Sequence, residues 1–353
     1  MRKENINNLL KRLWDYLIKT SGLMALGLFA TLIVGVIFQQ IGNASGFTPL
    51  SDMGATLQLF MGVGIGVAIA FKDKDNTNPL NIVALGAVGG LASAVNYNFD
   101  SPFIFAFSIT NGTKNPLTVY LVVILSIEIS KLILRKKTPV DIILVPFLIS
   151  VLGAIFSFAL VIPLSFVINA LSGFVNEATT YQPILMGMVI SVVMGMALTA
   201  PISSVAISVA INLSGIAAGA ACVGCCTQMI GFMIMSIRDN NIGKVISVGV
   251  GTSMLQFQNI LKKPLIWLPT IIVSFILGPI STAVMGLTCN AVGAGMGTCA
   301  LLGPIQMVLT TADPLMGWLG ATLMCVVIPA IGVFGIDLLF RKLNLIKKGD
   351  LAI

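Results

Sequence analysis

No histidine occurs among the 353 residues of this sequence. Histidine is the side chain that most often serves as a general acid or base near neutral pH, and it is also a common metal ligand. Without it, no nucleophile–base pair and no mixed set of metal ligands can be assembled from the remaining residues. We therefore expect a protein without catalytic residues, without a bound metal and without a cofactor.

Charge is also scarce. Only 9% of the residues are charged, whereas 57% are hydrophobic, and the mean hydropathy is +1.01. The hydrophobic residues form long runs instead of alternating with polar ones, which indicates a helical membrane protein and excludes an outer-membrane barrel. The net charge of +7 comes from basic residues that flank these runs, so we expect the lipid bilayer as a partner and no nucleic acid.

Cysteine occurs six times, always within apolar segments, so a disulfide framework is not expected. Cys222, Cys225 and Cys226 have the spacing of a metal or redox motif, but no second pair of ligands follows at zinc-ribbon spacing. We interpret these cysteines as small hydrophobic side chains.

Two stretches of 29 residues resemble each other, with a constant offset of 78 positions. Eight aligned positions are identical, and they include Pro, Asn and Gln, which are unusual matches between apolar segments. We interpret the stretch as an internal repeat of a polar, broken-helix unit inside the membrane. The first copy contains Pro201, Ile202, Ser203, Asn212, Gly215, Gly219, Gln228 and Met229, and the second contains Pro279, Ile280, Ser281, Asn290, Gly293, Gly297, Gln306 and Met307.

The hydrophobic pattern predicts an all-α polytopic membrane protein with about ten transmembrane helices and two re-entrant hairpins. The hairpins are assigned to residues 201–222 and 281–303, which are too rich in Gly, Ser and Asn for simple spans. Residues 1–20 are predicted to form an amphipathic helix at the membrane surface. The expected spans lie near residues 21–38, 54–71, 81–96, 117–134, 140–163, 183–200, 223–237, 245–261, 264–280 and 315–340.

The basic residues orient these spans. With a cytoplasmic N-terminus, 17 of the 20 Lys and Arg residues fall on the cytoplasmic side, as the positive-inside rule requires. Both termini are therefore expected in the cytoplasm, and the loop 238–244 is expected outside. The alternative is that this loop is cytoplasmic, in which case one span of the second half would move. Three expected spans separate Pro201 from Pro279, so the second hairpin should enter from the opposite side, which makes the repeat an inverted one.

Four amide side chains of the repeat are the main candidates for contact with a solute. Asn212, Asn290, Gln228 and Gln306 each offer donors and acceptors, which suits a neutral solute that carries hydroxyl or amide groups. The alternative is that these amides bond between helices or cap the helix breaks.

Hydroxyl side chains follow both prolines of the repeat. Pro201 and Pro279 lack an amide proton and block the continuation of a helix, so each is expected to start a hairpin arm. The hydroxyls are then expected to cap the broken helices or to face the solute, although they are also common packing residues in membrane helices. They belong to Ser203, Ser204, Ser281 and Thr282.

Acidic residues inside a membrane are strong indicators of function. Neither expected hairpin contains Asp or Glu, so neither offers a carboxylate for proton or sodium coupling. Glu177, at the edge of the second half, is the carboxylate that we select as a candidate for solute or proton contact. The alternative is that Glu177 is an exposed loop residue.

The repeated unit PIS[ST]…N…G…G…QM, the amphipathic first helix and the ten-span count resemble the membrane component, enzyme IIC, of the bacterial phosphotransferase system. The whole chain is similar to the stand-alone IIC-like group once described as perfringolysin O regulators. The resemblance implies a homodimer in the bacterial plasma membrane and elevator-type alternating access. It also implies a scaffold and dimerisation domain at 1–165 and a transport domain at 183–340. The polar residues between them indicate a crossover segment at 166–182, and the basic residues after the last span indicate a cytoplasmic tail at 341–353.

Sugar-transporting members of that family use a hairpin glutamate and a histidine at the phosphorylated substrate site, and this sequence has neither. We therefore expect a transporter for a small polar solute, a sugar or another hydroxylated or amide-bearing metabolite. Phosphorylation is expected only if a separate soluble IIB-type protein supplies the phosphate. The alternative is a membrane-embedded solute sensor that regulates gene expression through a partner.

Overall fold

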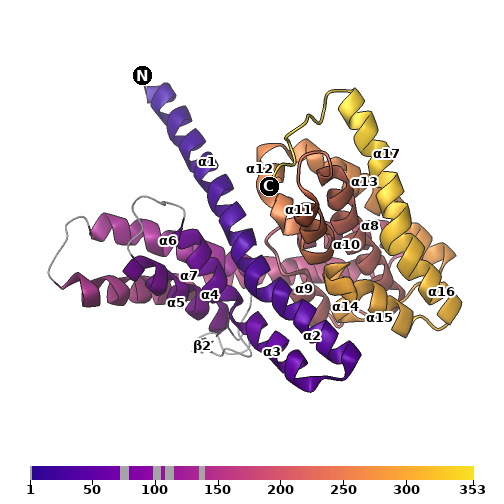
Figure 1. Ribbon diagram of the computed structural model, residues 1–353, viewed down its shortest axis with the longest axis horizontal. Helices are drawn as coiled ribbons and strands as arrows, with labels where there is room; N and C mark the ends of the chain where they lie inside the picture. Colours follow the sequence, from indigo (N-terminus) through magenta and orange to yellow (C-terminus); the bar gives the residue numbers. More distant parts are fainter. Residues whose placement is uncertain (1, 72–78, 98–104, 108–114, 135–139) are drawn as a thin grey trace. The chain divides into compact units, whose positions relative to one another are not determined.

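The computed structural model describes residues 2–71, 79–97, 105–107, 115–134 and 140–353, and these are helical almost throughout (Figure 1). The chain divides into two compact units. The first consists of Met1–Leu32 with Ala55–Leu164, and the second of Ile33–Gly54 with Ser165–Ile353. The roles that the sequence assigns to residues 1–165 and 183–340 stay predictions.

Close glycine packing joins the helices of the first unit. A methyl carbon added at Gly62 of α4 (Met61–Ala70) would lie 2.1 Å from the carbonyl oxygen of Gly89 in α5 (Pro79–Ala94). Such contacts let two membrane helices approach backbone to backbone. The unit also contains α1 (Arg2–Leu28), α6 (Pro116–Ile133), the first part of α7 (Asp141–Ala178) and an antiparallel pair of short strands, β1 (Val95–Tyr97) and β2 (Phe105–Phe107).

Six helical segments of the described chain are long and apolar enough to cross a membrane. A seventh is reached if α3 (Thr48–Leu59) and α4, which are bent by 49°, form one span. The helical, multi-pass class is therefore confirmed, whereas the count of ten spans is not. The six segments are Lys11–Ser45, Pro116–Ile133, Asp141–Ala178, Gly215–Ser236, Pro264–Val284 and Pro314–Lys342, and the shorter apolar helices are Pro79–Ala94, Pro183–Thr199, Ile242–Gly251 and Cys299–Thr310.

Two expected segments are not separate elements. The amphipathic residues at the N-terminus belong to α1, which continues through a π-helical turn at Phe29–Ile33 into α2 (Val34–Ser45). The crossover expected at 166–182 is mostly the second half of α7, a helix of 38 residues that contains Pro146 and Pro163. Internal prolines are tolerated in membrane helices, because neighbouring groups satisfy the freed backbone carbonyls.

The long helix α10 (Gly215–Ser236) forms the centre of the second unit, with 18 of its 22 residues buried. It packs against α8 (Pro183–Thr199), where a methyl carbon added at Gly224 would lie 1.9 Å from the carbonyl oxygen of Ser191. Other elements of this unit include α9 (Ser204–Ala210), η5 (Pro264–Trp267), α13 (Leu268–Pro279), η6 (Ile280–Val284), α16 (Pro314–Leu319), η8 (Gly320–Val327) and α17 (Ile328–Lys342).

The segment expected as a span at 245–261 is instead a broken hairpin, called here the 242–262 hairpin. One arm is α11 (Ile242–Ile246) with a π-helical turn at Ser247–Gly251. The chain is extended at Thr252, with φ −159°, and the other arm is η4 (Ser253–Gln256) with α12 (Phe257–Lys262). The side chains of Lys244 and Lys263, at its two ends, both bind the C-terminal tail.

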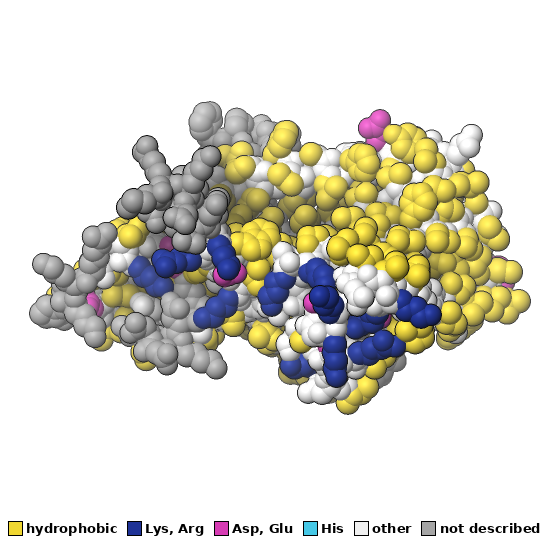
Figure 2. Space-filling view, turned by 90° about the horizontal axis from the view of Figure 1, so that it is seen from above, with side chains coloured by type: hydrophobic (Ala, Val, Ile, Leu, Met, Phe, Trp, Pro, Cys, Tyr) yellow, Lys and Arg dark blue, Asp and Glu magenta, His cyan; other side chains and the backbone are white. Residues whose placement is uncertain are grey.

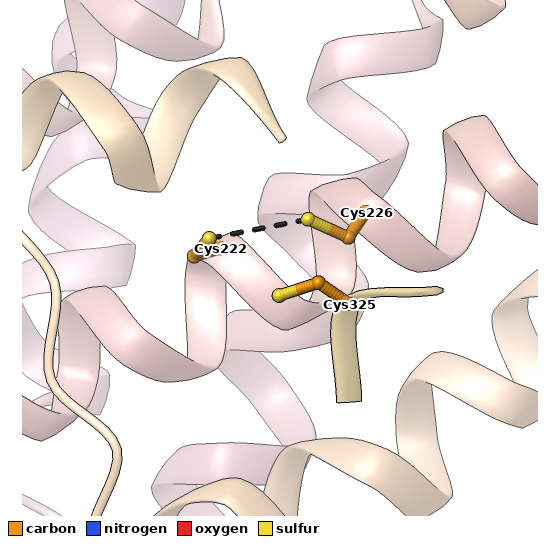
Figure 3. A group of neighbouring side chains, drawn as sticks. All are labelled: Cys222, Cys226 and Cys325. Carbon is orange, nitrogen blue, oxygen red and sulfur yellow. Dashed lines mark hydrogen bonds between the residues drawn. The ribbon is translucent and has the colours of Figure 1, made fainter. Parts of the chain in front are cut away.

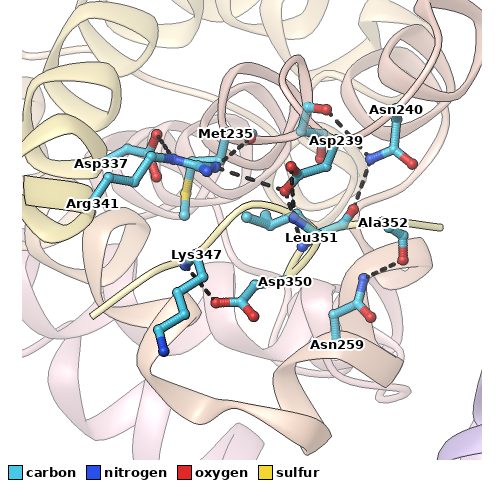
Figure 4. A network of polar contacts seen from close by, with 12 residues as sticks. Met235, Asp239, Asn240, Asn259, Asp337, Arg341, Lys347, Asp350, Leu351 and Ala352 are labelled. Carbon is cyan, nitrogen blue, oxygen red and sulfur yellow. Dashed lines mark hydrogen bonds and ion pairs between the residues drawn. The ribbon is translucent and has the colours of Figure 1, made fainter. Parts of the chain in front are cut away.

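The C-terminal tail is bound into this end of the unit by polar contacts (Figure 4). The carboxylate of Asp239 accepts from the backbone N–H groups of Gly349 and Leu351, and the buried amide of Gln256 donates to the carbonyl of Leu351 at 2.9 Å. Burial alone would raise the pKa of Asp350, but hydrogen bonds from Lys263 and the backbone of Lys347, with their positive charges, hold that pKa below its ordinary value.

These contacts correct the expected position of the loop 238–244. Asn240 donates to the carbonyl of Leu351 at 2.7 Å and accepts from the N–H of Ile353 at 2.8 Å. The loop therefore lies on the same side as the tail, and the expectation that a membrane separates the two is wrong. Figure 2 shows that Lys and Arg side chains and broad hydrophobic areas both occur on the visible face.

A second broken hairpin, called the 291–310 hairpin, overlaps the one expected at 281–303. It consists of α14 (Ala291–Met296), η7 (Cys299–Leu301) and α15 (Leu302–Thr310). Its tip contains three residues with left-handed φ, and Thr298 at this tip donates to the carbonyl oxygen of Gly249 in the 242–262 hairpin at 2.5 Å. The three residues are Gly297 (φ 54°), Ala300 (φ 46°) and Leu301 (φ 58°).

The two copies of the sequence repeat fold differently. In the first copy α10 runs without a break, so the expected boundary between a hairpin at 201–222 and a span at 223 is absent. The second copy folds back at its tip. The N–H of Cys289 donates to the carbonyl of Gly215 at 3.2 Å, so the turns that precede α10 and α14 lie at the same end of the unit, and entry from opposite sides is not observed.

This arrangement predicts which positions share a face of the membrane. Single cysteines introduced at the exposed positions Asn241 and Lys348 should react with a membrane-impermeant maleimide from one face. Cysteines at Asn212 and Thr310, at the opposite end of the unit, should react from the other face. The six native cysteines are buried and need no removal. Labelling of positions 241 and 348 from opposite faces would contradict the fold.

Candidate functional site

Two of the four candidate amides form a pair. The side-chain nitrogen of Asn290 donates to Oε1 of Gln306 at 2.7 Å, while Oδ1 of Asn290 accepts from the N–H of Gly293 at 2.9 Å and caps α14. Both side chains are partly exposed. Thr288 and Thr310 exchange hydrogen bonds beside them, at 2.8 and 2.9 Å, and hold the two ends of the 291–310 hairpin together. The result is an accessible, uncharged group of amides and hydroxyls.

Asn212 lies at the same end of the unit. Its φ of 47° is left-handed, which asparagine tolerates better than most residues, and its side chain is exposed. Gly215, three residues later, has φ 65° and bonds to Cys289, the neighbour of Asn290. The two asparagines of the repeat are therefore found on adjacent turns.

Gln228 is separated from this group. It lies 13 residues after Gly215 in a continuous helix, which corresponds to about 20 Å along the axis. Its side chain is fully buried, and Oε1 accepts from Thr199 at 3.3 Å, from the indole N–H of Trp267 at 3.0 Å and from Thr270 at 2.9 Å. The Nε2 group has no partner among the described residues. The four amides thus occupy two places and not one.

The hydroxyl candidates bind backbone carbonyls and amides of the broken helices. Ser203 caps α9 by accepting from the N–H of Ala206 at 3.2 Å. Ser204 donates to the carbonyl of Gly295 at 2.7 Å, and Ser281 to that of Gly278 at 2.7 Å. Thr282 donates to the carbonyl of Pro183 at 2.7 Å. These contacts hold segments together at the breaks.

The two prolines of the repeat behave differently. After Pro201 the chain turns into α9, as expected. Pro279 lies inside a helix, so the expectation that it ends one is wrong. The chain continues through it into the π-helical turn Ile280–Val284, whose wider spacing accommodates the missing N–H.

Glu177 lies in the last turn of α7, with its side chain exposed. Its exposure agrees with the alternative, although the residue ends a helix instead of lying in a loop. No described contact connects its carboxylate with the amide group, so its proposed contact with the solute stays a prediction.

Sequence reasoning missed the partners of Gln228. Thr199 and Ser253 share a hydrogen bond of 2.9 Å, and Trp267 and Thr270 come from another helix. These residues lie outside the repeat or are common in membrane helices, so no local signal distinguished them. The contact of Thr298 with Gly249 was missed for the same reason.

The sequence of the chain matches one known protein family over most of its length. The sequence model for the phosphotransferase system EIIC component matches residues 18–353. The chain belongs to that family. EIIC proteins are membrane permease components of a sugar phosphotransferase system and depend on other components for phosphoryl transfer. The resemblance to enzyme IIC of the phosphotransferase system is confirmed, and neither curated proteins nor solved structures give a match.

Because Gln228 and Gln306 have different surroundings in this EIIC protein, we expect substitution of each to change its stability to a different extent. Gln228→Met leaves the indole N–H of Trp267 without its acceptor, so unfolding should become easier by about 1–3 kcal/mol. Gln306→Met, at a partly exposed position, should change stability by less than about 1 kcal/mol. Unfolding of both variants in detergent tests this, and equal destabilisation would contradict the assigned surroundings.

Proposed function

We propose that this EIIC protein transports a small, uncharged polar solute, a sugar or another hydroxylated or amide-bearing metabolite, by alternating access. The observation that supports this most is the meeting of two broken hairpins inside the second unit. Irregular backbone is tolerated at membrane depth where it is buried in protein or lines a polar cavity. Transporters place their solute sites at such broken helices.

The two hairpins enter the bilayer as re-entrant elements in this proposal. The ends of the 242–262 hairpin are at the C-terminal tail, whereas those of the 291–310 hairpin are joined by Thr288 and Thr310 at the opposite end. Their tips meet through Thr298 and Gly249. Opening of either hairpin would expose the interior to one side of the membrane, which is the requirement for alternating access.

Asn290 and Gln306 are the proposed contacts for the solute, with Asn212 on the adjacent turn. Amides combine donors and acceptors and can replace the water around hydroxyl groups. No charged residue occurs in 245–261 or 281–312, which favours a neutral solute. Glu177 stays a second candidate contact, and Ser203, Ser204, Ser281 and Thr282 stabilise the breaks around the path.

Transport in this proposal does not include phosphoryl transfer by the chain itself. The sequence offers no histidine, and its hairpins offer no carboxylate. A separate IIB-type protein would have to dock on the cytoplasmic loops to supply phosphate. A homodimer through the first unit, and an elevator-type movement of the second, complete the proposal as the family relationship suggests.

The amide of Asn290 is tested separately from its capping role. Ser caps a helix about as well as Asn, so Asn290→Ser keeps α14 capped but removes the amide donor. We expect uptake of the transported solute to fall at least tenfold in both Asn290→Ser and Asn290→Ala. The matched control is Asn241→Ser, which likewise keeps a helix cap, that of α11, and removes an amide at a distance from the proposed site, and it should transport normally.

Full uptake by Asn290→Ser, with loss only in Asn290→Ala, would mean that Asn290 is a cap and would contradict solute contact. Binding of a solute by the wild-type protein without any uptake would support the sensor function instead.

A further inference from the structure

Three of the six cysteines gather at one point in the second unit. Cys222 and Cys226 lie one turn apart on α10, and their sulfur atoms are 4.0 Å apart. Cys325 comes from the π-helical segment η8, and its sulfur points toward the other two (Figure 3). The three sulfur atoms lie within 4.8 Å of one another, and all three residues are buried. Cys289, a fourth thiol, approaches Cys222.

The spacing of these sulfur atoms fits a single ion. Zinc–sulfur bonds are about 2.3 Å long, which places thiolates about 3.8 Å apart in a tetrahedral site and about 4.0 Å apart in a planar trigonal one. The distance between Cys222 and Cys226 falls in this range. Met307 adds a soft thioether 3.8 Å from the sulfur of Cys325.

Neighbouring glycines keep space for the sulfur atoms. A methyl carbon added at Gly303 would lie 2.8 Å from Sγ of Cys222, and one added at Gly293 would lie 2.6 Å from Sγ of Cys289. Side chains at these two positions would push the thiols apart. Gly293 is also one of the eight residues that are identical in the two copies of the repeat.

We propose that Cys222, Cys226 and Cys325 bind a divalent thiophilic cation, such as Zn²⁺, with Cys289 or Met307 as a further ligand. A donor set made of sulfur selects soft or borderline metals over Mg²⁺ and Ca²⁺. This site goes beyond the transport function and does not depend on it.

The apolar surroundings determine the charge of the complex. No charged residue occurs in 215–236 or 320–336, so a neutral assembly is favoured in the interior. The thiolate and not the thiol is the metal ligand, so each cysteine that coordinates the ion loses its proton. A divalent cation compensates most of the negative charge that results. Consequently the apparent dissociation constant should fall with rising pH below the thiol pKa, by about tenfold per pH unit for each proton released.

The ion would join three segments that are distant in the sequence. Cys222 and Cys226 belong to α10, Cys325 to η8, and Cys289 and Met307 to the segments that carry Asn290 and Gln306. A bound ion would thus restrain the 291–310 hairpin against α10, directly beside the amide group.

The test titrates the detergent-purified, reduced protein with Cd²⁺ and follows the ultraviolet thiolate-to-metal charge-transfer band. We expect one ion for each chain, and at least about 100-fold weaker binding in Cys222→Ala, Cys226→Ala and Cys325→Ala, because even the loss of a neighbouring hydrogen bond costs 10–100-fold. Cys299→Ala is the matched control, a buried cysteine outside the group, and should bind within about threefold of wild type.

A second measurement needs no variant. Zn²⁺ should raise the melting temperature of the wild-type protein, and a chelator should reverse the effect, because a ligand that binds only the folded state stabilises it. No charge-transfer band at one equivalent of Cd²⁺, equal weakening in Cys299→Ala, or a melting temperature unaffected by Zn²⁺ would overturn the proposal.

Discussion

The second unit depends on one constraint, which is that a backbone carbonyl or N–H group in the hydrocarbon region must find a partner within the protein. An unbroken helix meets this requirement by itself, and a broken one does not. At the breaks of this protein, hydroxyl side chains supply the partners. Ser204 and Ser208 of α9 donate to the carbonyls of Gly295 and Ala291, and Thr298 donates to that of Gly249. Without such contacts the hairpins would expose unsatisfied backbone to lipid.

Much of this architecture could be predicted from composition and from the repeat. The apolar runs gave the helical, multi-pass class, and the Pro, Asn and Gly residues of the repeat located most turns. The repeat could not show whether a helix continues after its glycines. The aligned residues Gly219, Cys222 and Val223 lie in the unbroken helix α10, whereas Gly297, Ala300 and Leu301 adopt left-handed φ. The difference arises because α10 packs at the centre of the unit. Such packing depends on residues distant in the sequence, so the local sequence does not predict it.

The same difference explains why the amides do not meet in one place. Folding at the tip of the 291–310 hairpin returns Gln306 to Asn290, whereas continuation of α10 carries Gln228 away from Asn212 into a network with Thr199, Trp267 and Thr270. The side of the loop 238–244 could not be predicted either. The distribution of positive charges agreed with a loop outside the cell. The position of the loop is instead fixed by the hydrogen bonds that Asp239 and Asn240 form with the distant C-terminal tail.

The central claim is that these broken helices form a path for a neutral polar solute, and counterflow in proteoliposomes that contain only this chain tests it most directly. Vesicles loaded with an unlabelled solute from a panel of sugars and related metabolites are diluted into a trace of the labelled form. The account predicts saturable, transient accumulation of label for at least one neutral solute, without a phosphoryl donor. Absence of counterflow for every neutral solute, or accumulation that requires a phosphoryl donor, would contradict it.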